Sequence, residues 1–99
     1  MKHDFTPVAR LELLEAVNYY ESQGIGLGAK FSAEVWRTIE RMEEDPYRLR
    51  PLPNGARRCL THIFPYSIVY EILAERIVIV AIAHGSRRPG YWSRRLKRD

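Results

Sequence analysis

The stretch His84–Trp92 holds the densest group of side chains that could do chemistry. It reads His-Gly-Ser-Arg-Arg-Pro-Gly-Tyr-Trp. Arginine grips phosphate through parallel N–H donors, and histidine can donate or accept a proton near neutral pH. Tyrosine and tryptophan can stack on unpaired bases. The stretch therefore predicts a contact surface for an anionic or aromatic partner. Its candidate residues are His84, Arg87, Arg88, Tyr91 and Trp92.

Structural roles explain some of the same residues. His84 can cap the end of a strand, and Trp92 is typical of packing because a leucine follows four positions later. Tyr91 fits either role. Glycine, serine and proline around Arg87 and Arg88 indicate a loop, which makes these two arginines the strongest functional candidates. The remaining basic residues are predicted to form a solvated helix end. They are Arg94, Arg95, Lys97 and Arg98.

Other catalytic or metal-binding chemistry has no support in the sequence. The three histidines lie far apart, and no Cys-x-x-Cys or His-x-x-x-His pair occurs, so no zinc site is predicted. Cys59 and His62 lie three apart on a predicted strand and face opposite sides, which argues against a nucleophilic dyad and makes Cys59 a small core residue. Glycine-rich nucleotide-binding motifs are absent. We expect neither a metal nor a cofactor.

The net charge of +4 is distributed unevenly along the 99 residues. Residues 1–45 hold five basic and nine acidic residues. Residues 46–63 hold four arginines and no acid, and residues 84–99 hold six basic residues and one acid. A basic excess favours an anionic partner without naming one. The positive charge lies in two blocks, and the second overlaps the candidate contact surface.

Length and composition favour one globular domain spanning residues 1–99. A chain of this size holds one core built from two layers, and its 45% hydrophobic content is ordinary. The single cysteine excludes a disulfide framework and fits a reducing compartment. The N-terminus lacks the apolar run of a signal peptide, and the longest apolar run, Ile77–Ala83, is too short to span a membrane. We therefore expect a cytoplasmic protein with no membrane partner.

The first half of the sequence predicts a helical hairpin. Thr6 and Pro7 form a helix start, because threonine can cap free amides and proline suits the first helical position. Two apolar stripes at helical spacing follow, separated by residues 22–26, and Pro46 ends the second. The first stripe comprises Ala9, Leu13, Ala16, Val17 and Tyr20. The second comprises Leu27, Phe31, Val35, Ile39 and Met42.

The second half predicts three strands. Residues 57–63 alternate in polarity, and Arg58 points off this strand toward the edge where the candidate surface begins. Residues 66–73 alternate as well, with Tyr66, Ile68, Tyr70 and Ile72 on a core-facing side. Residues 76–84 are apolar on both faces, which is typical of a central strand or one covered twice.

The connections complete the predicted architecture. Ala74 and Glu75 lie where a two-residue hairpin turn belongs, but without glycine or asparagine a longer turn is expected. Pro89 is predicted to open a last short helix, and residues 2–5 a short edge strand. The sequence thus predicts an α+β fold, namely a small antiparallel sheet with an N-terminal helical hairpin on one face and a short C-terminal helix.

The sequence resembles the RelE/ParE toxin superfamily over nearly its whole length. The element order derived above agrees with that superfamily, and the Phe-Pro-Tyr and His-x-x-Arg-Arg-Pro pieces at this spacing are fairly specific. The resemblance is carried by Ala16–Glu21, Phe31–Val35, Phe64–Tyr70, Ile77–Ala83 and His84–Trp92.

This resemblance implies the toxin of a bacterial type II toxin–antitoxin operon. In that superfamily a small cognate antitoxin wraps the toxin, and the complex represses its own operon, so operator DNA is contacted only through the antitoxin. ParE-like members inhibit DNA gyrase. RelE-like members cut messenger RNA on the ribosome without a metal, so their partners are the ribosome and mRNA.

Ser67 bears on the choice between these branches. The RelE-like nucleases carry an arginine in the strand pattern Gly-Tyr-Arg-Leu-x-Tyr, where this chain has Ser67. We therefore favour the ParE-like branch. The first alternative is a RelE-like endoribonuclease, which needs fixed cations and a proton-transfer group. Its candidate catalytic residues would be Arg58, His84, Arg87, Arg88 and Tyr91. The second alternative is a non-toxic module that binds nucleic acid or protein.

Overall fold

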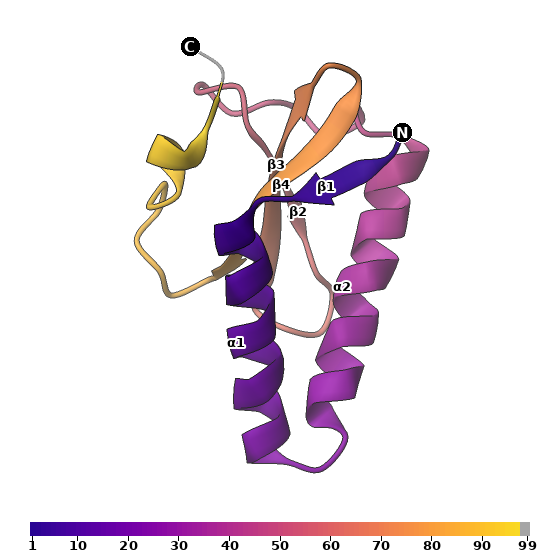
Figure 1. Cartoon of the computed structure of the whole chain (residues 1–99), viewed down its shortest axis with the longest axis vertical. Helices are drawn as coiled ribbons and strands as arrows, with labels where there is room; N and C mark the ends of the chain where they lie inside the picture. The colour runs from indigo at the N-terminus through magenta and orange to yellow at the C-terminus, as the bar shows by residue number, and fades with distance from the viewer. Residues whose placement is uncertain (98–99) are drawn as a thin grey trace.

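The computed structural model describes residues 1–97 and has the α+β architecture predicted from the sequence. Two helices form a hairpin against a four-stranded sheet (Figure 1). A short 3₁₀-helix follows the last strand. In chain order the elements are β1 (His3–Phe5), α1 (Pro7–Gln23), α2 (Leu27–Glu44), β2 (Arg57–Leu60), β3 (Tyr66–Leu73), β4 (Arg76–His84) and the 3₁₀-helix (Ser93–Arg95).

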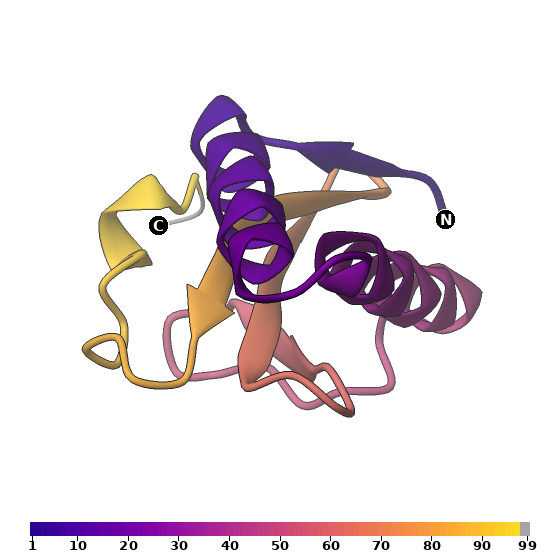
Figure 2. The same ribbon diagram turned by 90° about the horizontal axis from the view of Figure 1, so that it is seen from below.

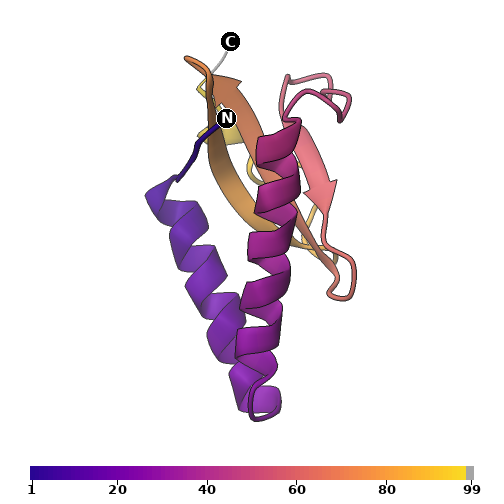
Figure 3. The ribbon, with the colours of Figure 1, turned by 90° about the vertical axis from the view of Figure 1, so that its right-hand side faces the viewer.

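The predicted helix start is confirmed. The Thr6 side chain caps α1 by accepting a hydrogen bond from the Ala9 amide at 3.2 Å, and Pro7 is the first helical residue. The predicted apolar stripes face the sheet, and Pro46 follows shortly after the end of α2. Both helices lie on the same side of the sheet, as Figure 3 shows.

The connection between the helices is tight because of two glycines. Gly26 has a φ of +83°, a left-handed conformation that other residues adopt at a cost. A Cβ atom at Gly28 would lie only 2.7 Å from the Val17 carbonyl oxygen, so only glycine permits this close approach of the helices. The Glu21 carboxylate then accepts the amides of Gly26 and Gly28 at 3.0 Å each and caps the start of α2.

The sheet is mixed rather than wholly antiparallel. Its strand order is β1-β4-β3-β2, with β4 between two neighbours as its apolar sequence predicted. The pairs β2–β3 and β3–β4 are antiparallel, as expected for short connections. The edge strand β1 pairs with β4 in parallel, which is possible because a long stretch of chain lies between the two strands. The prediction of an antiparallel sheet thus holds for three strands and is corrected for β1.

The strand predicted over residues 57–63 ends early, at Leu60. The Thr61 hydroxyl donates to the Phe64 carbonyl at 2.7 Å and starts a turn. The His62 amide donates to the carboxylate of Glu34 on α2 instead of continuing the strand. His62 and Ile63 therefore lie in an exposed loop, whereas Cys59 is buried in the core as predicted.

The β3–β4 hairpin has a two-residue turn, so the longer turn expected from its sequence is wrong. Leu73 pairs directly with Arg76. Ala74 and Glu75 both have positive φ, at 50° and 59°. Their backbone adopts the turn geometry that matches the twist of the strands even though neither residue favours it. The strand pairing therefore overrides the local preference of these two residues.

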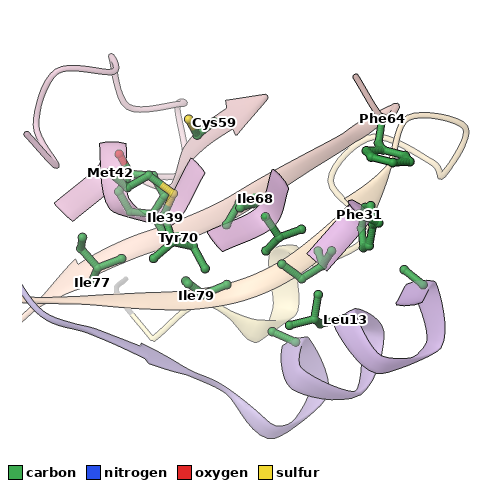
Figure 4. Close-up of a cluster of buried hydrophobic side chains, with 14 residues drawn as sticks. Leu13, Phe31, Ile39, Met42, Cys59, Phe64, Ile68, Tyr70, Ile77 and Ile79 are labelled. Carbon is green, nitrogen blue, oxygen red and sulfur yellow. The ribbon is translucent and has the colours of Figure 1, made fainter. Parts of the chain in front are cut away.

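Two apolar clusters lie on opposite faces of the sheet. The larger one fills the space between the sheet and the helices (Figure 4). The smaller one lies on the other face, under the C-terminal segment and the loop before β2, and Figure 2 shows that segment beside the sheet. The larger cluster includes Leu13, Phe31, Ile39, Ile68, Tyr70 and Ile79. The smaller one includes Ala56, Val69, Val80, Ala81, Ala83 and Trp92.

The C-terminal helix differs from its prediction. Pro89 does not open it, because Gly90 has a φ of +74° and the single 3₁₀ turn begins only at Ser93. Trp92 and Leu96 both pack in the smaller cluster, as their spacing predicted. Within residues 1–97 no helix combines the length and apolar character needed to cross a membrane.

Candidate functional site

The candidate site lies where β4 ends and the chain turns away from the sheet. The Gly85 amide donates to the Pro65 carbonyl at 2.7 Å, and the Arg87 amide donates to the His84 carbonyl at 3.0 Å. These bonds fix the turn that projects the arginines. A pocket of about 90 Å³ lies here. Its lining includes Arg58, Ser67, His84, Arg87, Arg88 and Tyr91, together with the edge of Trp92.

This pocket brings together residues that are far apart in sequence. Arg58 comes from β2 and Ser67 from β3, while the others follow β4. Arg58, Arg87 and Arg88 are exposed, so three guanidinium groups surround one small concavity. Arg58 thus reaches the edge that its place on the predicted strand indicated. The arrangement can bind an anionic group through several cations.

His84 has a defined orientation. Its Nδ1 accepts the Ser86 amide at 2.9 Å and lies 2.8 Å from the Ser86 hydroxyl. Because a backbone amide can only donate, the neutral ring carries its proton on Nε2. The ring of Tyr66 meets the imidazole edge to face, with centroids 5.0 Å apart. His84 therefore caps the turn through one nitrogen and offers its other nitrogen as a donor.

Arg87 is stacked on Tyr91. Its guanidinium carbon lies 3.8 Å from the centre of the Tyr91 ring. The Arg95 guanidinium carbon lies 5.1 Å from the same centre. A cation at these distances is attracted by the ring quadrupole. Tyr91 is therefore a platform for cations rather than a free side chain.

Glu12 of α1 binds both Tyr91 and Arg95 and so supports the cation platform. The sequence patterns did not predict this role. Its Oε2 accepts the Tyr91 hydroxyl at 2.8 Å, and its Oε1 accepts the Ile82 amide at 3.0 Å. Both oxygens also accept from Arg95, at 2.9 and 3.1 Å. Glu12 lies three positions after Ala9 and therefore borders the buried stripe of α1. This position was the one signal in the sequence that Glu12 could be a buried polar residue.

Arg95 is not part of a solvated helix end, which corrects that prediction. Its side chain is only 22% exposed, and it donates to the Val80 carbonyl at 2.9 Å as well as to Glu12. Val80 is the extra residue of a β-bulge, since its neighbours Ile79 and Ala81 pair with Tyr70 and Val69. The hydrogen bonds from Arg95 to Glu12 raise the pKa of its guanidinium further. Arg95 is therefore a structural cation that ties α1 to the irregular part of β4.

The hydroxyl of Tyr91 is committed to Glu12. Burial, together with the hydrogen bond to the Glu12 carboxylate, raises the pKa of Tyr91 to about 12. The phenol therefore stays protonated at neutral pH and donates to Glu12 rather than to a ligand. The role of Tyr91 as a proton-transfer group, considered for the nuclease alternative, finds no support in this geometry.

A second pocket lies on the other side of His84 and Arg87. It has a volume of about 160 Å³, and both residues line it as well as the first pocket. Glu12 and Glu15 contribute carboxylates, and Tyr19 and Tyr66 contribute rings. His84 and Arg87 thus form a wall between a basic concavity and a more acidic, aromatic one.

Comparison with known proteins places this chain in a family. The model for the ParE toxin of the type II toxin-antitoxin system, parDE, matches residues 4–89. The chain belongs to the ParE toxin family. A solved structure described as the chromosomal ParDE TA system from P. aeruginosa has a chain with a TM-score of 0.72 and 18% identity. The match covers 85% of this chain and 95% of that one. A comparison with curated proteins gave no match.

Membership of the ParE family confirms the resemblance drawn from the sequence. The match covers the helical hairpin, the sheet and the turn that carries Arg87 and Arg88. The solved structure supports the same fold, a helical hairpin packed on a small sheet. The structure thus sets the arginine-bearing turn within a ParE toxin scaffold.

Trp92 was predicted to contact a target, but only 5% of it is exposed, because its indole fills the smaller apolar cluster. Arg94 and Lys97 are exposed, as the interpretation of a solvated end predicted, while Arg98 lies outside the described residues. The exposed part of the candidate surface is therefore Arg58, Arg87 and Arg88 with His84 between them. Among residues 1–97, no three His, Cys, Asp or Glu side chains come together in a way that could hold a metal ion.

Proposed function

We propose that this ParE-family chain is the toxin of a toxin–antitoxin pair, that it acts in the cytoplasm by inhibiting DNA gyrase, and that a cognate antitoxin neutralises it. The observation that carries the proposal is the family match over residues 4–89. The exposed arginine turn at the end of β4 supplies the contact surface. Arg87 and Arg88 are its principal residues, and Arg58 and His84 complete it.

Exposed apolar surface supports a protein partner. Leu11 and Leu14 are each 54% exposed on the side of α1 that faces away from the sheet. Leu60, on the edge strand β2, is 65% exposed. A small domain leaves such surface open mainly where a partner covers it. An antitoxin segment that orders on binding would cover it as a helix or an added strand.

The charge around β2 favours an acidic segment in that partner. A groove of about 450 Å³ runs beside the strand. Arg41, Arg48 and Arg58 line it, and none of its lining residues within the described chain, residues 1–97, is acidic. Opposite charges across an interface speed association and fix its register. We therefore expect the antitoxin to place carboxylates along this groove.

The proposal is tested by induced expression and by a supercoiling assay with purified gyrase. Expression should arrest growth and induce the DNA-damage response, and coexpression of the cognate antitoxin should restore growth. The purified protein should inhibit supercoiling. Arg87→Ala and Arg88→Ala should each weaken inhibition by about tenfold or more, which is typical of arginines that become buried at the centre of an interface. Arg50→Ala removes an exposed loop arginine that lines neither pocket at the turn and should leave inhibition unchanged. Normal growth together with uninhibited gyrase would exclude the proposal.

The endoribonuclease remains a second candidate because Arg58, His84 and Arg88 share one pocket, which suits a phosphate. Two observations weigh against it. Ser67 lines that pocket where the RelE-like pattern has an arginine, and the Tyr91 hydroxyl is bound to Glu12. Cleavage of messenger RNA on translating ribosomes, abolished by Arg88→Ala, would establish this alternative. Intact mRNA in the same assay would exclude it.

A further inference from the structure

We propose that Glu12 is a positioning residue for the target-binding turn, acting through Tyr91 on Arg87. The inference rests on the proposed function for its biological meaning, because the turn is taken as the surface that contacts the target. The geometry itself does not depend on the identity of the target. Glu12 lies on α1, 75 to 79 residues before the side chains it supports. Only 12% of its side chain is exposed, so it holds the surface without being part of it.

The first link joins Glu12 to Tyr91. The carboxylate has hydrogen-bond partners on both oxygens, namely the Ile82 amide, the Tyr91 hydroxyl and two nitrogens of Arg95. The Ile82 amide is part of β4 and does not move independently of the sheet. Hydrogen bonds from charged partners are the stronger kind, and a carboxylate held by several donors has one preferred orientation. The Tyr91 ring is therefore held in a fixed position relative to both α1 and β4.

The second link joins Tyr91 to Arg87. Within residues 1–97 the Arg87 guanidinium makes no hydrogen bond or ion pair, and its contact is the face of Tyr91 at 3.8 Å. The turn fixes the backbone of Arg87, but its exposed side chain lies between a serine and another arginine in the sequence, and neither holds it in place. Long side chains lose rotamer freedom on binding, and a side chain that is already ordered loses less. Fixing the ring thus pre-orders the arginine.

The third point is that Arg95 balances the charge of Glu12. Arg95 donates to both carboxylate oxygens of Glu12, whereas Arg87 contacts the ring of Tyr91. It remains on the outer face of Tyr91, where it lines both pockets. The Glu12–Arg95 pair therefore supports the platform and leaves Arg87 free to meet a target.

Glu34 provides a matched control. It is also a buried glutamate that accepts a backbone amide, from His62, and pairs with an arginine, Arg37. In the described part of the chain, its side-chain hydrogen bonds go to Arg37 and His62 and not to the turn. Glu12→Gln and Glu34→Gln each remove one buried carboxylate and keep the side-chain size. We expect both variants to lower stability, but only Glu12→Gln to weaken gyrase inhibition, by about tenfold after matching the folded fraction.

A readout on the free protein separates this inference from the proposed function. The Tyr91 ring at 3.8 Å shifts the NMR resonances of the Arg87 side chain through its ring current. Glu12→Gln should move these resonances toward the values of a solvated arginine, and Glu34→Gln should leave them in place. Tyr91→Phe, a milder change that keeps the ring but removes the hydrogen bond, should move them in the same direction. If wild-type protein fails to inhibit gyrase, the proposed function fails while this measurement still judges the positioning.

A double variant tests whether Glu12 acts through Arg87. In the background of Arg87→Ala, adding Glu12→Gln should cause no further loss of inhibition, although it should still lower stability. Equal and additive losses would show that Glu12 acts by another route and would overturn the inference. Unchanged Arg87 resonances in both Glu12→Gln and Tyr91→Phe would overturn it as well.

Discussion

The face of the sheet that carries α1 and α2 and the face that carries the C-terminal segment are covered by different kinds of structure. The helical face is packed through regular apolar stripes, with aromatic rings such as Phe31 and Phe64 in mutual contact. The other face is covered by irregular chain that packs through the smaller apolar cluster around Trp92 and is fixed by a few polar contacts. Arg95 binds Glu12, and the Lys97 amide donates to the buried carboxylate of Glu71. The helical face, which packs through regular apolar stripes, has a structural role. The candidate site lies on the other face, where individual polar contacts hold the chain.

This difference has a consequence for function. A helix packed through a stripe tolerates change at many exposed positions, because no single contact sets its place. The C-terminal segment has only a few polar anchors, and the turn proposed to bind the target lies immediately before it. Substitutions at those anchors should therefore alter both stability and target contact. Four predictions test this comparison, beginning with the largest effect.

The first prediction is that the second face is a true core. Trp92→Ala should cost about 3–5 kcal/mol of unfolding free energy, as much as Phe31→Ala on the helical face, because both leave a large cavity. Urea denaturation of the two variants measures this directly. Trp92→Phe should cost less than Trp92→Ala because it keeps most of the buried area. A loss below about 1 kcal/mol for Trp92→Ala would mean that the C-terminal segment merely rests on the sheet.

The sequence predicts the regularly packed helical face better than the face that is held by long-range contacts. The stripe of Phe31 and Ile39 and the cap at Thr6 are local, so periodicity and residue type were sufficient to find α1 and α2. The apolar strand β4 was found for the same reason. The parallel pairing of β1 depends on contacts more than 70 residues apart, as the pair between Asp4 and Arg76 illustrates, and no local pattern reports it.

The candidate site was predicted in part. Its arginines stand out because glycine and proline indicate a loop, and Arg58 could be placed by the direction of its strand. Glu12 and Arg95 could not be paired, because they lie 83 residues apart and each has an ordinary local explanation. Trp92 was named both as a packing residue and as a candidate target contact, because residue type alone does not tell which face of the turn is buried. Long-range polar contacts are thus the part that sequence patterns leave out.

The second prediction separates Arg95 from its basic neighbours. Arg95→Met should cost about 1–3 kcal/mol, because it leaves Glu12 and the Val80 carbonyl without their cationic donor in a largely buried setting. Arg94→Met changes an exposed residue and should lie within about 0.5 kcal/mol of wild type. Chemical denaturation measures both. Equal losses of stability in the two variants would support the original prediction of a solvated basic end. They would also mean that Arg95 does not anchor the C-terminal segment.

The third prediction concerns alkaline pH. Tyr91→Phe should cost about 1 kcal/mol at neutral pH, the usual worth of one hydrogen bond. The pKa of Tyr91 is raised from 10.0 to about 12 in the folded chain, so its stabilising contribution is complete below pH 10 and is lost as the pH rises toward 12. Stability measured from pH 9 to 12 should therefore fall, and fall less steeply in Tyr91→Phe. Burial also raises the pKa values of Tyr66 and Tyr70, so part of the slope should remain. Identical slopes in both proteins would contradict the bond to Glu12.

The fourth prediction, with the smallest expected effect, concerns the turn between β3 and β4. Ala74 and Glu75 have positive φ, which costs energy in residues with a Cβ atom. Replacing Glu75 by glycine and Ala74 by asparagine gives the pair that this turn prefers and should stabilise the protein by about 0.5–1 kcal/mol. Both residues are exposed at the end of the hairpin away from His84, so target contact should not change. Stabilisation without a change in inhibition would show that the hairpin limits stability independently of the second face. A loss of stability would mean that Ala74 and Glu75 are held in place by contacts other than strand pairing.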